Sequence, residues 1–522
     1  MAAIPLEGHL GKYLLLKATV RDRSTGATNV FYPAGSFSRS TRFADTPAHT
    51  YIPGLLSKSL NFGASFFTGA DPVKLSNSGG TGVLDMVDLK QELEYLHDYS
   101  WDNADLEIFR GDFDALYSAW SSVAKLTATD LIGNQNLKRI RLRDAAWRLQ
   151  CPVHNKYYLG TGGIEGGANL TGQWKPYLLG YGNNLPAIQI DTANQIFQFT
   201  WTSSAVSAVR HGGIPLTFDA NYASYALLAA ATVPTGKYAT CEAQGLVRPN
   251  VTLTRSIRVD AQGDFSTQNG QTTPYQRAQI ARRVATCYGD TNYADSGDLD
   301  TASFSAVASA HTAFCGWFWD KEISKANALT EIMSGILGYW YLKANGKLAI
   351  GYLRDPSLLT ADTIIPYKDY GMSTIEMIDM ISPRAVTKIG YLRNYGPEDI
   401  SSLASGVNQD DAIYYGSESL WYTRDTKAAI QAIYPTAQTV QIQGNFQQST
   451  DAQAEANRQH TIFSVPRRRY RWSMEIDIFA DILDQPIQIT GVNQLSLGSS
   501  KQLLCVGVDG VGFGPLTTDW WG

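Results

Sequence analysis

Hydrophobic and polar residues alternate in many short stretches of this chain, a period of two that is typical of half-buried β-strands. In residues 137–143 (LKRIRLR), the arginines at odd positions share one face, and Ile140 and Leu142 share the other. The same reasoning predicts strands at 12–21, 29–32 and 51–54, and a hairpin over 187–200. Strands are therefore expected along most of the chain.

Helical periodicity is predicted in only three places, at residues 274–285, 326–337 and 451–460. The second of these has an apolar stripe at helical spacing, formed by Leu329, Ile332, Met333, Ile336 and Leu337. The order is strand-rich, then short helices, then strand-rich again, which argues against an alternating βαβ sheet. The sequence predicts a mainly β, multidomain protein with an α+β insertion.

The chain has 522 residues, several times the usual size of one domain. It contains no internal repeat and no low-complexity linker to mark boundaries. We divide it into an N-terminal β domain (1–185), a second β domain (186–270), an α+β domain with a helix and hairpin (271–380) and a C-terminal β-barrel domain with one helix (381–522).

The composition of the chain predicts that part of its surface is covered by partner subunits. Hydrophobic residues make up 44% of the chain and charged residues only 17%, with 28 Tyr and 12 Trp. A surface this weakly charged is expected where subunits meet. The net charge of −5 argues against a general binder of nucleic acid or acidic membranes.

The cysteines and the N-terminus indicate a reducing compartment. The N-terminal residues have no charged leader ahead of an apolar core, so no signal peptide is expected, and no apolar run approaches the length of a membrane span. The five cysteines are scattered, without CxxC, and fit free thiols in cores better than a metal site assembled from distant residues. They are Cys151, Cys241, Cys287, Cys315 and Cys505.

Motifs for catalysis or cofactor binding are missing, so we predict no catalytic residue, no cofactor and no metal. The glycine-rich stretch 160–172 lacks GxGxxG, because Glu165 replaces the last glycine, and it is expected to be a flexible loop. GxSxG and HExxH are absent. The isolated histidines are expected to be surface or capping residues; they are His9, His49, His97, His154, His211, His311 and His460.

Two acidic clusters are candidates for chemistry. In the first, two carboxylates brought together could act as an acid/base pair, although a strand with a charged, solvated outer face is favoured. Its members are Asp102, Asp105, Glu107, Asp112 and Asp114. The second, in the loop 289–300, offers oxygen ligands for calcium but has Ala294 at the fifth position of the EF-hand pattern, and at the sixth Asp295 replaces glycine. Its candidate ligands are Asp290, Asn292, Asp295 and Asp298.

Two basic patches contain aromatic residues, an arrangement that could hold a phosphate backbone. In an acidic chain, subunit contacts or pairing with neighbouring carboxylates are favoured instead. The first patch is Lys138, Arg139, Arg141, Arg143 and Arg148 with Trp147; the second is Arg467, Arg468, Arg469 and Arg471 with Tyr470 and Trp472.

Several segments, taken in order, resemble those of the hub proteins at the tail tip of long-tailed bacteriophages and gene transfer agents. The early ones are residues 28–62, WDNADLEIFRGDFDAL (101–116), residues 140–163 and NLTGQWKPYLLGYGNNLPAIQID (169–191). The last of these is similar to a G-x-x-KP-x-x-x-G turn of that family, here formed by Gly172, Lys175, Pro176, Gly180 and Gly182.

The resemblance continues through the second half. Residues 236–265 resemble a β element that returns through a D-x-x-G turn, here Asp260–Gly263. Residues 336–356 resemble the family's helix and hairpin, with Asn345–Gly346 as the turn. Segments 386–400 and 434–442, the helix 451–460 and a closing β segment follow in the same order.

This resemblance implies tail-tube-like antiparallel β-barrel domains, a homotrimer whose two such domains per chain form a pseudo-six-fold ring, and a location at the virion tail tip after assembly in the bacterial cytoplasm. The implied partners are the hexameric tube and distal tail protein, the tape-measure protein and three-fold tip or central fibre proteins, with genomic DNA passing through the lumen and no stable membrane insertion. The alternatives are a tail-associated cell-wall or polysaccharide hydrolase and a receptor- or carbohydrate-binding tail protein.

Overall fold

The computed structural model describes residues 12–35, 41–42, 49–56, 60–67, 81–112, 116–143, 145–271, 274–361, 363–368, 372–474, 481–511 and 515–522. Strands account for 43% of the chain and helices for 21%, so the prediction of a mainly β protein is confirmed. No helix among the described residues is long and apolar enough to cross a membrane.

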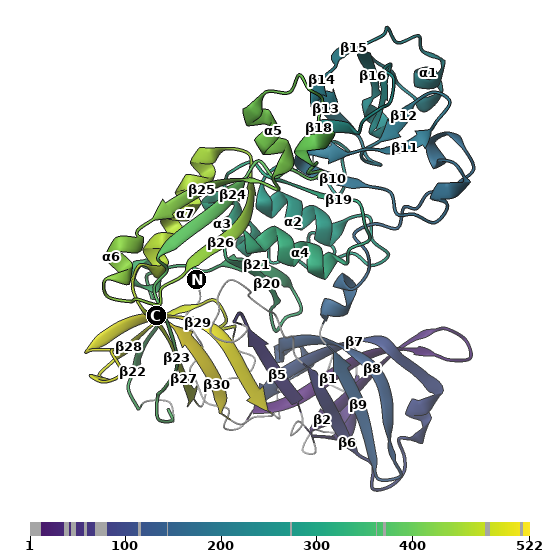
Figure 1. Ribbon diagram of the computed structural model, residues 1–522. Coiled ribbons are helices and arrows are strands. Elements are labelled where there is room, and N and C mark those ends of the chain that lie inside the picture. Colours follow the sequence, from purple (N-terminus) through teal and green to yellow (C-terminus); the bar gives the residue numbers. More distant parts are fainter. Residues whose placement is uncertain are drawn as a thin grey trace.

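The lower part of the molecule is one hydrogen-bonded network of fifteen strands, which we call the base sheet (Figure 1). Its N-terminal strands are β1 (Lys12–Asp22), β2 (Thr28–Gly35), β3 (Thr41–Arg42), β4 (His49–Leu56), β5 (Leu60–Ser65), β6 (Thr81–Val87), β7 (Tyr99–Asp112), β8 (Ser121–Asn134) and β9 (Leu137–Arg143). Its C-terminal strands are β22 (Thr363–Pro366), β23 (Glu376–Ile381), β27 (Arg467–Met474), β28 (Pro486–Thr490), β29 (Ser500–Val511) and β30 (Leu516–Trp521). The predicted strands at 12–21, 29–32, 51–54 and 137–143 all lie here.

Strand pairing in the N-terminal half follows a barrel-like circuit. β1 pairs with β2, β2 with β4, β4 with β6, β6 with β9, β9 with β8, β8 with β7, and β7 again with β1. Only two residue pairs, Leu55–Met86 and Leu56–Asp85, join β4 to β6. β6 also pairs with β5, so the sheet continues through β5 into the C-terminal strands, and the described strands form no closed barrel.

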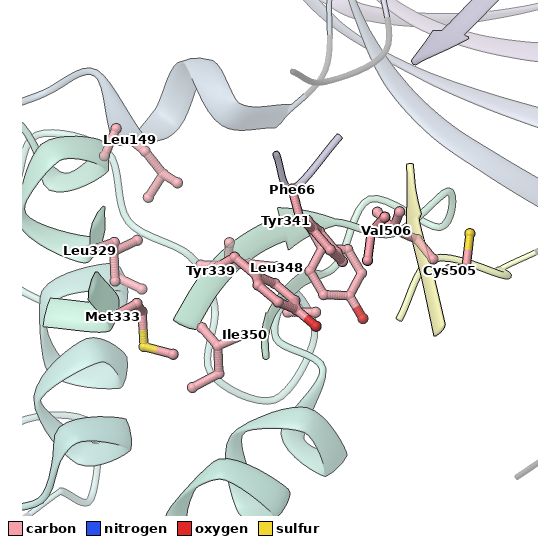
Figure 2. Close-up of a cluster of buried hydrophobic side chains, with 14 of the residues drawn as sticks. Phe66, Leu149, Leu329, Met333, Tyr339, Tyr341, Leu348, Ile350, Cys505 and Val506 are labelled. Carbon is pink, nitrogen blue, oxygen red and sulfur yellow. The ribbon is translucent and has the colours of Figure 1, made fainter. Parts of the chain in front are cut away.

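The N-terminal and C-terminal parts of the chain pair with each other in this sheet. Residues Ser65–Asn61 of β5 pair antiparallel with Gly507–Val511 of β29. Just beyond β5, the ring of Phe66 stacks on Tyr339 with centroids 3.7 Å apart, and Figure 2 shows Cys505 and Val506 of β29 beside them. One core therefore joins N-terminal, central and C-terminal residues.

The upper part holds two five-stranded sheets and the short helix α1 (Tyr225–Ala230) (Figure 1). The first sheet has β10 (Tyr177–Pro186), β13 (Ser204–His211), β14 (Ile214–Pro215), β18 (Ile257–Gly263) and β19 (Gly316–Trp319). The second has β11 (Ile188–Asp191), β12 (Ile196–Gln198), β15 (Thr217–Asn221), β16 (Lys237–Cys241) and β17 (Leu246–Pro249). The predicted hairpin at 187–200 is the antiparallel pair β11–β12.

A helical layer lies between base and top. It contains α2 (Arg277–Thr286), α3 (Thr301–Ala310), α4 (Lys325–Ser334), the hairpin β20 (Gly338–Leu342)–β21 (Leu348–Tyr352) and a three-stranded sheet covered by α7 (Ser449–Phe463). The three strands are β24 (Val386–Tyr391), β25 (Leu420–Asp425) and β26 (Thr439–Phe446). The three predicted helices are α2, α4 and α7. All five residues of the predicted apolar stripe are buried, although α4 ends at Ser334 and Ile336 and Leu337 follow it.

The prediction that helices occur in only three places is wrong, because α1, α3, α5 (Gln409–Gly416) and α6 (Lys427–Gln431) also form. In α3 the sequence is mainly alanine and serine, and only Phe304 and Val307 are buried, so the helix has no apolar stripe to reveal it. The other three are too short for a reliable period.

Candidate functional site

A polar groove runs along the outer face of β1, β7 and β8. It consists of two cavities of about 380 Å³ and 540 Å³, which share Thr19 and Asp105 in their linings. The opposite wall is formed by Trp147 and Arg148 of the 3-10 turn η3 (Ala145–Leu149), by the loop at Asp298 and by the hairpin turn at Gly346. We call this feature the β1–β7 groove.

Strand alternation places the predicted acidic cluster on this groove. Leu106 and Ile108 of β7 point into the core and are 1% exposed, so Asp105 and Glu107 face outward. Glu107 lies opposite Lys17 of β1 and Lys125 of β8. The predicted strand with a charged outer face is therefore confirmed, while the side chain of Asp112 and all of Asp114 lie outside the described residues.

Two carboxylates of β7, those of Asp105 and Glu107, face the groove. Asp105 and Glu107 stand two positions apart on the same face of β7. The Ser122 hydroxyl donates to Glu107 Oε1 at 2.7 Å, and Lys125 Nζ lies 3.9 Å from the same oxygen.

The first basic patch is largely neutralised by carboxylates. Its ion pairs are Arg139–Asp85 at 2.7 Å, Arg141–Asp130 at 3.4 Å and Arg148–Asp298 at 2.9 Å, and Arg143 stacks over Trp147 at 4.7 Å. Lys138 does not belong to this surface: with an even position in β9 it points inward, is 2% exposed and lies 2.5 Å from Glu94 Oε2. The pairing with carboxylates that the sequence favoured is confirmed.

The second basic patch is paired in the same way. Its ion pairs are Arg467–Asp355 at 2.5 Å, Arg469–Asp379 at 2.8 Å, Arg469–Asp519 at 3.0 Å and Arg471–Asp519 at 2.7 Å. The hydrogen bond to Asp519 raises the pKa of Arg471. Tyr470 and Trp472 are buried and cannot stack on nucleic-acid bases.

The candidate calcium ligands of loop 289–300 are each engaged by another protein group. Asp290 accepts from Asn155 Nδ2 at 2.9 Å, Asn292 accepts from the buried Lys325, Asp295 pairs with Arg282 and Asp298 pairs with Arg148. Each oxygen thus has a different protein partner. In the part of the chain that the structure describes, no group of three or more His, Cys, Asp or Glu side chains is placed to hold a metal ion.

Two histidines are in the core, and the prediction of surface or capping positions is wrong for both. His154 is fully buried, with its ring 3.8 Å from that of Trp174, and burial lowers its pKa to about 3. His311 lies 4.0 Å from Glu455, and burial lowers its pKa to about 4 despite that carboxylate. Their aromatic neighbours, Trp174 for His154 and Tyr352 for His311, are distant in sequence and gave no local signal.

The cysteines and the glycine-rich loop are the remaining features considered in the sequence. Cys241, Cys287, Cys315 and Cys505 are buried free thiols, as expected, and Cys151 is half-buried. In the glycine-rich loop, Glu165 accepts a hydrogen bond from Lys175 Nζ at 2.7 Å.

Sequence reasoning missed two buried arginines. Arg277 donates to the carbonyls of Ile332 and Gly444 and lies over the ring of Trp317. Arg283 donates to the carbonyls of Ser266 and Gln271. Nothing in a polar helical sequence distinguishes such arginines from exposed ones.

Comparison with known proteins gives only distant structural likenesses. No protein-family model and no curated protein matches the chain. Among solved structures, it is similar to prophage tail protein gp18 from Listeria monocytogenes EGD-e (7% identity, 97% of this chain and 94% of that chain covered, TM-score 0.32). It is also similar to the tail protein from Neisseria meningitidis MC58 (8%, 97% and 95%, 0.34) and to a chain of the native gene transfer agent virion (12%, 67% and 84%, 0.37). These TM-scores are too low to establish a common fold.

Proposed function

We propose that the chain is a structural, non-enzymatic protein of a bacteriophage-type tail, which forms the trimeric hub at its distal end. In this role it joins the hexameric tube and distal tail protein to three-fold tip or fibre proteins, and its lumen is the channel for DNA ejection. The order of segments described from the sequence supports this role.

The observation that carries the proposal is the open C-terminal edge of the base sheet. Within the described ranges, β23 pairs only with β27, and β22 only with β28. Met377 and Met380 of β23 are 41% and 56% exposed, and Ile364 of β22 is 57% exposed. The six-residue edge strand β23 has one unpaired side and exposed apolar residues, which favours pairing with another chain, so we expect this edge to be covered in an assembled ring.

Neutralised basic patches fit the same role. A channel that lets DNA slide must not hold its phosphates, and binding to DNA strengthens with each lysine or arginine that contacts a phosphate. Because the arginines of both patches are mostly paired with carboxylates, they offer few free cations for such contacts.

The proposal is tested on intact virions and with the purified chain. Gold-labelled antibody against the chain is expected to mark the distal end of the tail, and the purified chain is expected to bind the distal tail protein. A label elsewhere on the particle, together with no binding, would refute the proposal. Cell-wall zymography with Asp105→Asn and Glu107→Gln tests the hydrolase alternative: clearing by the unmodified chain that both variants lose would establish it.

A further inference from the structure

The β1–β7 groove has almost balanced charge. Five cationic side chains and four carboxylates line it: Lys17, Arg21, Lys125, Arg148 and Lys347, and Asp102, Asp105, Glu107 and Asp298. A polyanion such as DNA needs an excess of positive charge, and a lone metal ion needs converging oxygens. Neither condition is met here, so the groove favours a ligand without net charge.

Several of these charged groups are free to bind a ligand. Arg148 and Asp298 are paired at 2.9 Å, and Glu107 is held by Ser122. By contrast, the side chains of Lys17, Lys347, Asp102 and Asp105 form no hydrogen bond or ion pair with any described residue. The groove therefore presents charged donors and charged acceptors side by side.

Uncharged polar groups and one aromatic ring complete the lining. The hydroxyls of Thr19, Thr28, Ser100 and Thr127 and the amides of Asn103 and Asn345 lie among the charges. Trp147 lines the second cavity, and its Nε1 is buried without a hydrogen-bond partner among the described residues. Because this N–H is buried, the part of Trp147 that a ligand in the groove can contact is its ring, over which Arg143 also lies at 4.7 Å.

We propose that the β1–β7 groove binds a neutral oligosaccharide without cleaving it. Sugar hydroxyls donate to carboxylates and accept from lysines at once, and the apolar face of a sugar ring packs on an aromatic side chain. The two adjoining cavities, about 380 Å³ and 540 Å³, have the size of small-molecule sites and form an extended groove suited to a short chain of sugars. This activity goes beyond the proposed tail function and does not depend on it.

The experiment measures binding of the full-length chain to short neutral oligomers of N-acetylglucosamine, glucose, galactose and mannose. Polygalacturonate serves as the anionic probe and chitosan as the cationic one. We expect binding to at least one neutral oligomer, without product release on long incubation. Asp105→Asn and Trp147→Ala are each expected to weaken it by about tenfold or more, because each removes a charged or aromatic partner of the sugar.

Two further variants separate loss of binding from loss of folding. Trp147→Phe keeps a ring but removes the N–H, and is expected to lose less affinity than Trp147→Ala. Asp410→Asn, at an exposed position on α5, is the matched control and is expected to bind like the unmodified chain. Binding of none of the neutral oligomers, binding of charged polymers only, or unchanged affinity in Asp105→Asn would overturn the proposal.

Discussion

The helical layer and the C-terminal edge of the base sheet differ in what they bury: the layer buries paired charged groups, whereas the edge exposes apolar side chains. In the helical layer, buried charged groups have partners within the chain: Arg277 donates to two carbonyls, and Glu455 accepts from Arg458 and Gln459. At the edge, β23 and β22 leave one side unpaired and expose Met377, Met380 and Ile364. The difference matches the proposed assembly, in which the helical layer packs within one chain and the β23 edge is covered by a neighbouring chain.

The largest expected effect comes from Arg277→Ala in the helical layer. The guanidinium is 1% exposed and joins α2 to the carbonyl of Ile332 on α4 and that of Gly444 on β26. Removing it leaves two buried carbonyls unpaired and a cavity, which should cost about 3–5 kcal/mol of local stability. Hydrogen exchange of the backbone amides of α2 and α4 measures this loss of stability, and Arg424→Ala, at an exposed position, is the control. Equal protection of these helices in both variants would contradict the claim that the buried Arg277 stabilises the helical layer.

Asp484→Asn tests the contact between the helical layer and the base sheet. Asp484 accepts from Tyr339 Oη at 2.5 Å and from Arg354 Nη2 at 2.6 Å, and its burial raises its pKa. Neutralising it leaves Arg354 without its charged partner, at an expected cost of about 3 kcal/mol. The loss should appear as faster exchange in both β20 and β29, whereas an effect confined to β20 would show that the two parts are not coupled there.

Acid should destabilise the helical layer through His311. Burial lowers the pKa of His311 to about 4, whereas the unfolded chain takes up a proton near its ordinary value of 6.5. Stability should therefore fall as the pH drops from 6.5 to 4, by about 3 kcal/mol once both values are passed. Thermal melting across this range should be less pH-dependent in His311→Gln, with a remaining slope from His154; an unchanged slope would exclude His311 as a cause.

The smallest expected effect is that of Arg471→Ala near the edge. Although Arg471 pairs with Asp519 at 2.7 Å, its side chain is 47% exposed, so water screens the interaction. The expected cost is at most about 1 kcal/mol. A loss as large as that of Arg277→Ala in thermal melting would mean that the edge, too, is held mainly by internal ion pairs.

Local sequence pattern predicted much of the secondary structure. The alternation in 137–143 predicted β9, and the apolar stripe of α4 predicted a buried helix, because both depend on neighbours a few residues apart. The pairing of β5 with β29 joins residues more than four hundred positions apart, and no local period encodes it.

The candidate site was predictable only in part. The acidic face of β7 follows from strand alternation, but the opposite wall of the groove comes from η3, the loop at Asp298 and the turn at Gly346. These segments meet only through tertiary packing. The sequence therefore predicts the carboxylates of the site but not the groove that they line. Likewise, charge alone assigns Lys138 to the basic surface, whereas its even position in β9 directs its side chain into the core.

The most direct test of the central claim is the mass of the assembled protein in solution, measured by sedimentation equilibrium. The unmodified chain is expected to form a trimer, and Met377→Lys with Met380→Lys is expected to shift it to monomer with its melting temperature unchanged. Leu227→Lys, an equally exposed apolar position on α1 far from the base sheet, is the matched control and should remain trimeric. A monomeric unmodified chain, or a trimer that survives both methionine substitutions, would contradict assembly through the β23 edge.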